Sequence, residues 1–419
     1  MNKIVYLFIL LFALGKLYGQ STTGVENQKR ELTLNDAIEI GLKNNPEIKS
    51  SLEKINAAGG RFWSGISLPS PELSVRYEWT PKDKSLRSFS ERTQEVNQSF
   101  EFPTNYFLRG SKLSTEKEIT ENEFRLTELN IIAQIKSAYF NVLAKENQLK
   151  IAEENLAIAE DFFKKAEIRY NVGEGTNLEK LTAKVQFTEA KNNAEVQRNL
   201  VKTAYAELNY VLGYGKEAKE KLFVLSDSLT YHSKEYTLEG LVNDAEKVSP
   251  QLKVSELKVS SSSVSKTLAW SSLLPNFNLA YFKQTRDGDN GYYGASFGIS
   301  IPLWFMFDQR GKIEEASANV SIAESELQLT KNSVYLRIKN ALTEFQNADR
   351  QVQLYVKDIL PQADEVYRTA SKSYDAGEIT YLEFLQAKQT LINSRNNYIN
   401  ALLAHNVAIA TLEQTVGNR

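Results

Sequence analysis

The chain carries two copies of one sequence unit. The segment YNVGEGTNLEKLTAK, which starts at Tyr170, returns 204 positions later as YDAGEITYLEFLQAK, which starts at Tyr374. The same offset pairs Pro46 with Pro250, far toward the N-terminal end of each copy. An ungapped offset that holds at both ends of a segment indicates an internal duplication. We therefore expect two halves of roughly 180 residues with the same fold.

Each half is predicted to begin with a broken helix and to continue with two strands. Apolar-periodic runs lie on both sides of Pro46, and again of Pro250, and a threonine suited to capping a helix precedes each first run, at Thr33 and Thr237. A switch to period two follows each broken helix. It predicts strands over about 71–80, 93–102, 275–285 and 291–303.

One face of these predicted strands is apolar, and the other carries charged or small residues. The residues on the apolar face are Leu73, Val75, Tyr77, Trp79, Phe297 and Ile299. Further aromatic residues mark the strand ends, at Phe100, Phe102 and Trp304. Strands of about ten residues with this alternation and with aromatic ends are typical of outer-membrane barrels, in which the apolar face contacts lipid. A soluble sheet packed on a helix is the alternative that the strands alone leave open.

Very long helical runs distinguish between these alternatives. From Ser111 to Val172 the sequence has no glycine or proline, which predicts a helix roughly 90 Å long. The third run is interrupted only by Pro361. The four runs are 111–172, 176–212, 312–376 and 378–416. They predict two antiparallel helical hairpins far longer than those of globular proteins, rich in small and polar residues that suit close packing around a wet interior.

The predicted strands and helices together describe a conduit that one chain cannot complete. Four strands do not close a barrel, and open sheet edges are not tolerated in lipid. We therefore expect copies of the chain to associate and complete the sheet. The fold class predicted is mainly α with a small β part, built from a duplicated strand–strand–long-hairpin unit.

Composition excludes several other functions. The net charge of −2 gives no electrostatic footprint for nucleic acid. Cysteine is absent and the only histidines are His232 and His405, so we expect no disulfide, no metal site and no cofactor. Carboxylate pairs arise by chance among 52 acidic residues, and no histidine-centred constellation accompanies them, so we predict no enzyme.

The first residues have the layout of a secretory signal peptide. Lys3 precedes an apolar run from Ile4 to Leu14, and the small residue Gly19 marks the expected cleavage point. A membrane anchor is the alternative, but the run is well short of the ~20 residues that span a bilayer. We expect an exported protein, divided into a signal peptide (1–19), an N-terminal segment (20–31), a first repeat (32–215), a linker (216–236) and a second repeat (237–417).

These features together resemble one known group, the TolC family of outer-membrane efflux proteins. The resemblance rests on the duplication, on PSPELSVRYE at the first strand, and on LPQADEVYRTASKSYDAGEITYLEFLQAKQTLINSRNNYINA in the second repeat. It covers essentially the whole mature chain. It implies a homotrimer whose twelve strands, four from each chain, form a barrel in outer-membrane lipid, continued by a helical barrel in the periplasm. It also implies two partners, a periplasmic adaptor (membrane fusion protein) and an inner-membrane pump.

The two turns quoted at the outset are then the hairpin tips at the periplasmic end, and we expect them to dock the adaptor. The predicted docking residues are Gly173, Glu174, Gly175, Thr176, Gly377, Glu378, Ile379 and Thr380. A tight turn between helices requires positive φ at Gly173 and Gly377. The alternative is that these glycines only cap helices and contact no partner.

The family resemblance also implies a periplasmic gate. In this family acidic side chains six and nine residues after the second tip glycine form rings at the closed mouth, which places them here at Glu383 and Gln386. Glu383 keeps an acidic ring, while Gln386 departs from the acidic pattern at the second position. A ring of carboxylates would favour cations. The alternative is that Glu383 is a solvated helix residue.

We expect the function to be passive export of small molecules or metal ions through an outer-membrane channel, with energy supplied by the pump. A second possibility is an exported coiled-coil scaffold or adhesin without a pore, although such a protein has no need of four strands with an aromatic face. The sequence does not distinguish a heavy-metal cargo from a drug.

Overall fold

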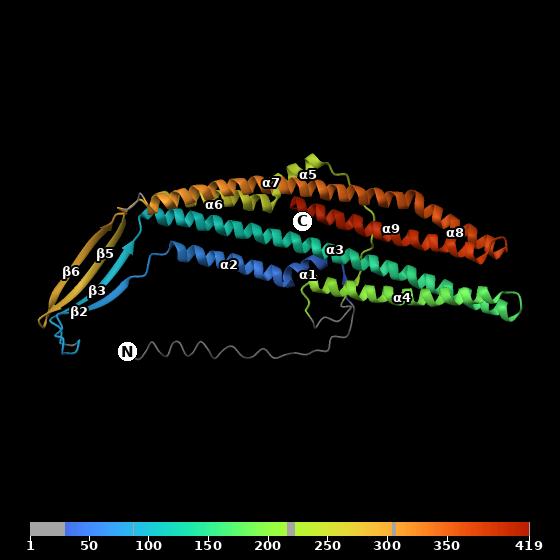
Figure 1. Ribbon diagram of the computed structural model, residues 1–419, viewed down its shortest axis with the longest axis horizontal. Coiled ribbons are helices and arrows are strands. Elements are labelled where there is room, and N and C mark those ends of the chain that lie inside the picture. Colours follow the sequence, from blue (N-terminus) through green and yellow to red (C-terminus); the bar gives the residue numbers. More distant parts are fainter. Residues whose placement is uncertain (1–29, 87, 216–222, 304–306, 419) are drawn as a thin grey trace.

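The structure is elongated, with a small sheet at one end and long helices that run from it to the opposite end (Figure 1). This computed structural model describes residues 30–86, 88–215, 223–303 and 307–418. The predicted signal peptide at 1–19, most of the predicted N-terminal segment and Trp304 lie outside the described residues.

The two halves repeat one order of elements, which confirms the predicted duplicated fold. The first half consists of α1 (Leu34–Asn44), α2 (Pro46–Ile66), β2 (Glu72–Glu78), β3 (Glu91–Phe100), α3 (Pro103–Asn171) and α4 (Asn177–Val211). The second half consists of α5 (Leu238–Val248), α6 (Pro250–Ser271), β5 (Asn276–Arg286), β6 (Asp289–Ser300), α7 (Asp308–Leu354), a π-helical turn η1 (Tyr355–Ile359), α8 (Leu360–Asp375) and α9 (Tyr381–Val416).

A short parallel strand pair connects the halves. β1 (Arg30–Leu32) pairs with β4 (Phe223–Leu225), and Leu32 and Phe223 are buried in the core of the first half. β4 lies within the predicted linker, of which residues 216–222 are outside the described residues. The described part of the linker is therefore packed onto the helices.

Local sequence determines where the short helices begin. The Thr33 side chain accepts a hydrogen bond from the Asp36 backbone and completes a capping box, and Thr237 caps α5 through the Gly240 backbone. Proline occupies the first position of α2 and of α6, where its missing N–H costs no helical hydrogen bond. The predicted threonine caps and proline breaks are confirmed.

The sheet contains four antiparallel strands in the order β2-β3-β5-β6, so β2 and β6 are edges with one neighbour each. The register aligns Leu73 with Val96, Val96 with Tyr281, and Tyr281 with Ala295. Directly opposed residues of paired strands share a face. The two faces of the sheet can therefore be assigned residue by residue.

The two faces differ sharply in chemistry. We call one the apolar face; its apolar members are Leu73, Val75, Tyr77, Val96, Phe100, Phe277, Leu279, Tyr281, Tyr293, Ala295, Phe297 and Ile299. The other, the polar face, includes Glu72, Ser74, Arg76, Glu78, Glu91, Thr93, Glu95, Asn97, Asn278 and Ser296. Phe282 and Tyr292 are the aromatic exceptions on the polar face, and the Phe282 ring occupies the space above Gly294.

Five of the six residues predicted to face lipid lie in strands on the apolar face. The side chain of Leu73 is 77% exposed in the single chain and that of Phe297 is 63% exposed. Trp79 is the exception. It follows the end of β2 and has φ of 58°, so it lies in the turn rather than in the predicted strand. Period-two alternation could not reveal this reversal of the backbone.

The longest helix follows the sheet almost directly. α3 has 69 residues, roughly 100 Å at 1.5 Å per residue, and it begins at Pro103 rather than near Ser111 as predicted. Gly110 lies inside it, where a Cβ would come within 3.3 Å of the Ile66 side chain. The glycine that suggested a helix boundary instead permits close packing of α2 on α3.

Pro361 does not end the helix in the second half. Proline has no N–H and its ring clashes with the carbonyl four residues earlier. The chain accommodates it with η1, a single π-helical turn directly before α8, so helical backbone continues from Asp308 to Asp375.

Small residues line the packed sides of the long helices. The buried alanines of α3 are Ala138, Ala144, Ala152, Ala159 and Ala166. The larger buried side chains form two clusters. The one around Tyr139 lies mainly in the first half and includes Val352, Ala401 and Leu402 of the second, and the one around Phe345 lies in the second half. In the described part of the chain, no helix combines the length and apolarity needed to cross a bilayer.

Candidate functional site at the hairpin tips

The two helical hairpins turn in the same way. Gly173 follows α3 with φ of 82°, and Gly377 follows α8 with φ of 76°. In each turn the next residue, Glu174 or Glu378, donates its backbone N–H to a carbonyl five residues earlier, the pattern of a Schellman motif. The predicted need for positive φ is therefore met at both glycines.

Thr176 and Thr380 cap the returning helices. The Thr176 side chain accepts from the Glu179 backbone at 3.1 Å, and Thr380 accepts from the Glu383 backbone at 3.3 Å. Both threonines were predicted as docking residues. Their hydroxyls are engaged in forming the turns, so a substitution at either position would also weaken a helix cap.

The carboxylate of Glu383 is held by its own helix end. Its Oε2 accepts from the Thr380 backbone at 2.7 Å and from the Thr380 hydroxyl at 2.8 Å, completing a capping box. These hydrogen bonds lower the pKa of Glu383. The side chain is exposed, and it lines a groove of about 530 Å³ that also includes Gln386 and Glu365. The structure thus brings the two predicted gate residues to one surface.

The repeat mate of Glu383 has different partners. Glu179 Oε1 accepts a hydrogen bond from the Tyr374 hydroxyl at 3.1 Å and from Arg169 at 3.3 Å. Arg169 lies in α3 and Tyr374 in α8, so this carboxylate joins the tip of the first hairpin to the tip of the second. We call these three residues the tip latch. Burial, and then the charge of Glu179, raise the pKa of Tyr374.

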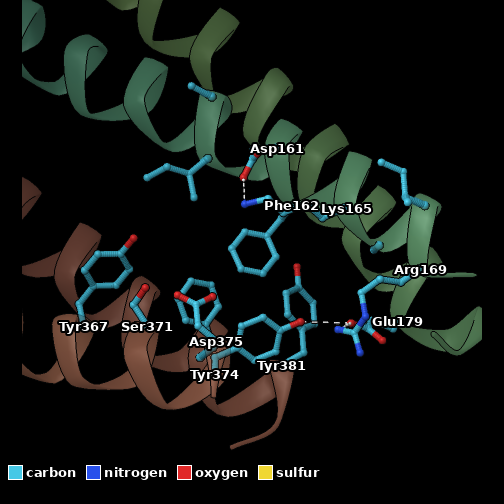
Figure 2. A pocket seen from close by; sticks show the side chains of 15 residues that line it. Asp161, Phe162, Lys165, Arg169, Glu179, Tyr367, Ser371, Tyr374, Asp375 and Tyr381 are labelled. Atoms are coloured by element: carbon cyan, nitrogen blue, oxygen red, sulfur yellow. Dashed lines mark hydrogen bonds and ion pairs between the residues drawn. The ribbon is translucent and has the colours of Figure 1, made fainter. Parts of the chain in front are cut away.

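An aromatic cluster supports the tip latch (Figure 2). Phe162 stacks on Phe384 with ring centroids 4.8 Å apart, and Tyr374 stacks on Phe384 at 5.4 Å. These side chains line a cavity of about 770 Å³ between the two hairpins, together with Tyr367, Tyr381, Arg169 and Glu179. Burial raises the pKa of Tyr381 to about 12. The cluster fixes the tyrosine that donates to Glu179.

The two tips therefore differ despite their repeated sequence. The offset that pairs Tyr170 with Tyr374 also pairs Lys180 with Phe384. In the first tip the Lys180 ammonium lies 4.5 Å from the centroid of the Tyr170 ring, a cation–π contact. In the second tip the aromatic ring of Phe384 takes that place beside Tyr374. Tyr381, whose repeat mate is Asn177, adds a second ring beside Tyr374, so the second tip has an aromatic cluster where the first has a cation–π pair.

A second difference between the repeats lies about one helical turn further along. Lys388 in α9 is 7% exposed, whereas its mate Lys184 is exposed. Burial lowers the pKa of Lys388 to about 8. A positive charge so placed weakens the folded state near neutral pH.

The two histidines lie apart from the tips and in different environments. His232 is exposed. His405 is fully buried against Asp349, with 3.4 Å between Nε2 and Oδ1, and burial lowers its pKa. Nowhere in the described ranges do three His, Asp or Glu side chains converge in the way that a metal site requires.

Exposed leucines complete the tip surface. Leu178 is 75% exposed and Leu382, its repeat mate, is 72% exposed. Both line a depression that also includes Ile379 and Gly377, between the ends of the two hairpins. The prediction from sequence missed these leucines and the tip latch. The repeat itself carried the signal for the leucines, because Leu178 and Leu382 recur at the same offset.

The fold and both repeats define a class of protein. The chain belongs to the outer membrane efflux protein family, whose model matches residues 38–214 and 241–418. Members of this family lie in the outer membrane and extend into the periplasm, and so does this chain. It is a family of transport proteins rather than of enzymes.

Individual relatives are similar over nearly their whole length. The cobalt-zinc-cadmium resistance protein CzcC of Cupriavidus metallidurans is 21% identical, over 92% of this chain and 90% of that protein. The outer membrane protein TolC of Vibrio cholerae is 21% identical, over 100% of this chain and 96% of that protein. A membrane protein from Pseudomonas aeruginosa has a similar structure, with a TM-score of 0.78, 16% identity and 97% of each chain covered.

Proposed function

We propose that three copies of the chain form the outer-membrane channel of a tripartite efflux system. The observation that carries this proposal is the sheet. It has one apolar and one polar face, two open edges, and a direct continuation into helices roughly 100 Å long. Closure of four strands from each chain into twelve would satisfy both edges, turn the apolar face to lipid and leave a polar lumen.

The channel is passive, and the energy for export comes from an inner-membrane pump through a periplasmic adaptor. We propose that the adaptor docks on the hairpin tips, where Leu178 and Leu382 provide exposed apolar anchors beside the glycine turns. Leu178→Glu with Leu382→Glu should abolish adaptor pull-down and leave the oligomer intact. Leu86→Glu is the control. It changes an exposed leucine in the loop between β2 and β3, at the opposite end of the molecule from the hairpin tips. Unchanged capture of the adaptor would contradict docking at the tips.

The tip latch and Glu383 are proposed to close the periplasmic mouth. The latch holds the second hairpin against the first within one chain, and three Glu383 carboxylates near the axis would attract cations and repel one another. Gln386 lies in the same groove without a charge. The gate thus combines a mechanical restraint with a ring of carboxylates.

The cargo is proposed to be small molecules or metal ions delivered by the pump. Similarity to a cobalt-zinc-cadmium resistance protein supports metal cations. The polar face of the sheet supports them too, because its strands carry Glu72, Glu78, Glu91 and Glu95 against Arg76 and Arg286. A lumen with this excess of carboxylates would concentrate cations.

Two measurements test the proposed channel. The mass of the purified protein in detergent should correspond to three chains, and the protein should produce discrete current steps in planar bilayers. A non-pore scaffold or adhesin would give no steps. A monomer or dimer without conductance would overturn the proposal.

A further inference from the structure

The charged residues of the sheet are separated between its two faces. All four glutamates of β2 and β3 lie on the polar face, with Arg76 and Arg286. The strand register places only two charged residues on the apolar face, Arg92 and Lys283, and both are cationic. A cation on a lipid-facing surface is costly near the bilayer midplane and costs little near the interface, so the position of these two along the strands matters.

The two cations lie near one end of the apolar face. Arg92 is opposite Tyr77 and Thr285, and Lys283 is opposite Gln94 and Tyr293. These rows are close to the hairpin turns, at the end of the sheet away from the helices (Figure 1). The rows at the other end contain Phe100, Phe277 and Ile299 instead.

Neighbouring cross-strand rows bring the two cations close to one another. Arg92 pairs with Thr285 and Gln94 pairs with Lys283, so Arg92 and Lys283 are diagonal neighbours on one face. Such diagonal pairs lie roughly 7–8 Å apart, within reach of long side chains. The loop that follows β2 carries exposed Lys82, Asp83 and Lys84 at the same end, one more positive than negative charge.

Neither cation is neutralised by a carboxylate within the described residues. Arg92 donates to the Thr285 hydroxyl at 3.3 Å and its guanidinium lies 5.5 Å from the Phe89 ring centroid, with no ion pair to a described carboxylate; its Nε is buried, so an anion would have to approach the two terminal nitrogens. Arg286, on the polar face, is by contrast paired with Glu91 at 3.3 Å. The cations of the apolar face are thus available to an anion from outside the chain.

We propose that Arg92 and Lys283 bind the phosphate groups of a phosphorylated lipid in the outer leaflet of the outer membrane. This inference rests on the proposed function, because it takes the apolar face as the lipid-facing one. With the helices in the periplasm, the end of the sheet that carries the hairpin turns reaches the outer leaflet. Tyr77 and Tyr293 lie in the same rows, as expected for aromatic residues at headgroup level.

The guanidinium and the ammonium then have complementary roles. Arg92 can form two parallel hydrogen bonds to one phosphate, while Lys283 acts as a point charge on the same group or on a second one. Basic residues at a membrane surface contribute about 1 kcal/mol each to binding of anionic lipid, which corresponds to roughly fivefold in affinity. Loss of both should weaken binding roughly 25-fold.

The test is native mass spectrometry of the whole protein in detergent, titrated with bisphosphorylated lipid A. Arg92→Gln with Lys283→Gln should weaken retention of the lipid roughly 25-fold, and Arg92→Lys with Lys283→Arg should restore most of it. Arg76→Gln with Arg286→Gln removes the same charge from the polar face of the same sheet and should change nothing. Lipid A without phosphates should bind weakly to every variant.

Three results would overturn the lipid site. They are unchanged retention in Arg92→Gln with Lys283→Gln, an equal loss in the polar-face control, or equal binding of phosphate-free lipid A. Conductance in phosphatidylcholine bilayers, measured in parallel, reports on the channel itself. If the wild type shows discrete current steps and any of these three results is obtained, only the lipid site is rejected. If the wild type shows no current steps, the proposed function is rejected.

Discussion

Removal of one hydroxyl group should open the proposed gate. Tyr374→Phe keeps the ring that stacks on Phe384 and contacts Phe162, and deletes only the donor to Glu179. The aromatic cluster should therefore persist, and the second hairpin should lose its polar attachment to the first. Glu179→Gln removes the charge of the acceptor and with it the ion pair to Arg169.

The magnitude follows from the environment of the tip latch. A hydrogen bond to a charged group contributes about 1.5–3 kcal/mol net, and partial exposure of this one reduces it to about 1 kcal/mol per chain. If three chains open together, the closed state loses about 3 kcal/mol. Since 1.4 kcal/mol is a factor of ten, the open fraction should rise roughly 100-fold in Tyr374→Phe.

Single-channel recording measures this change as open probability. Tyr170→Phe is the matched control, because it removes the same hydroxyl from the repeat mate, whose ring contacts Lys180 rather than the other hairpin. We expect open probability to rise in Tyr374→Phe and in Glu179→Gln and to stay unchanged in Tyr170→Phe. Equal behaviour of all three variants and the wild type would refute the tip latch as a restraint on the gate.

Three further predictions concern the second repeat. Gly377→Val forces a β-branched residue to φ near 76° and should destabilise the tip by about 1–2 kcal/mol, measured as a lower unfolding temperature. Gly59→Ala is the control: Gly59 lies in a helix with open space around it, so the alanine should not lower the unfolding temperature. Lys388 has its pKa lowered to about 8 by burial, so the free energy of unfolding should rise as pH increases from about 8 to about 10. Lys388→Met should stabilise the chain by up to about 3 kcal/mol at pH 7 and abolish that rise, and a rise that persisted would contradict the assignment. Glu383→Gln can still cap α9 but loses its charge, so block by a periplasmic trivalent cation should weaken while stability holds; undiminished block would remove Glu383 from the gate.

The large features of the fold could be predicted because each has a periodic signal. The 204-residue offset showed the duplication, and period-two alternation separated Leu73 and Val75 from Ser74 before any strand was seen. The predicted ends of helices and strands were less accurate, because single residues determine them. Gly110 suggested a helix boundary that packing overrides, and Trp79 left its strand through a backbone reversal that alternation does not encode.

The tip latch could not be predicted, because a repeated sequence does not reveal how its two copies pack on each other. Glu179 and Glu383 occupy equivalent positions after equivalent turns, yet Glu179 joins the two hairpins and Glu383 caps its own helix. Lys184 and Lys388 diverge in the same way, one exposed and one buried. The members of each pair occupy the same place after the same turn, and the side chains packed around them decide which contacts they make.

The most direct test of the channel compares two adjacent residues of β6 that point to opposite faces. Ser296 lies on the polar face and Phe297 on the apolar face. Ser296→Arg should insert normally and conduct with smaller current steps, because the arginine lies in the lumen. Phe297→Arg should cost up to about 2–4 kcal/mol, the penalty for an arginine on the lipid face at the midplane, and reduce insertion into the outer membrane. Equal tolerance at both positions, or tolerance only at Phe297, would contradict a barrel with a polar lumen and an apolar face in lipid.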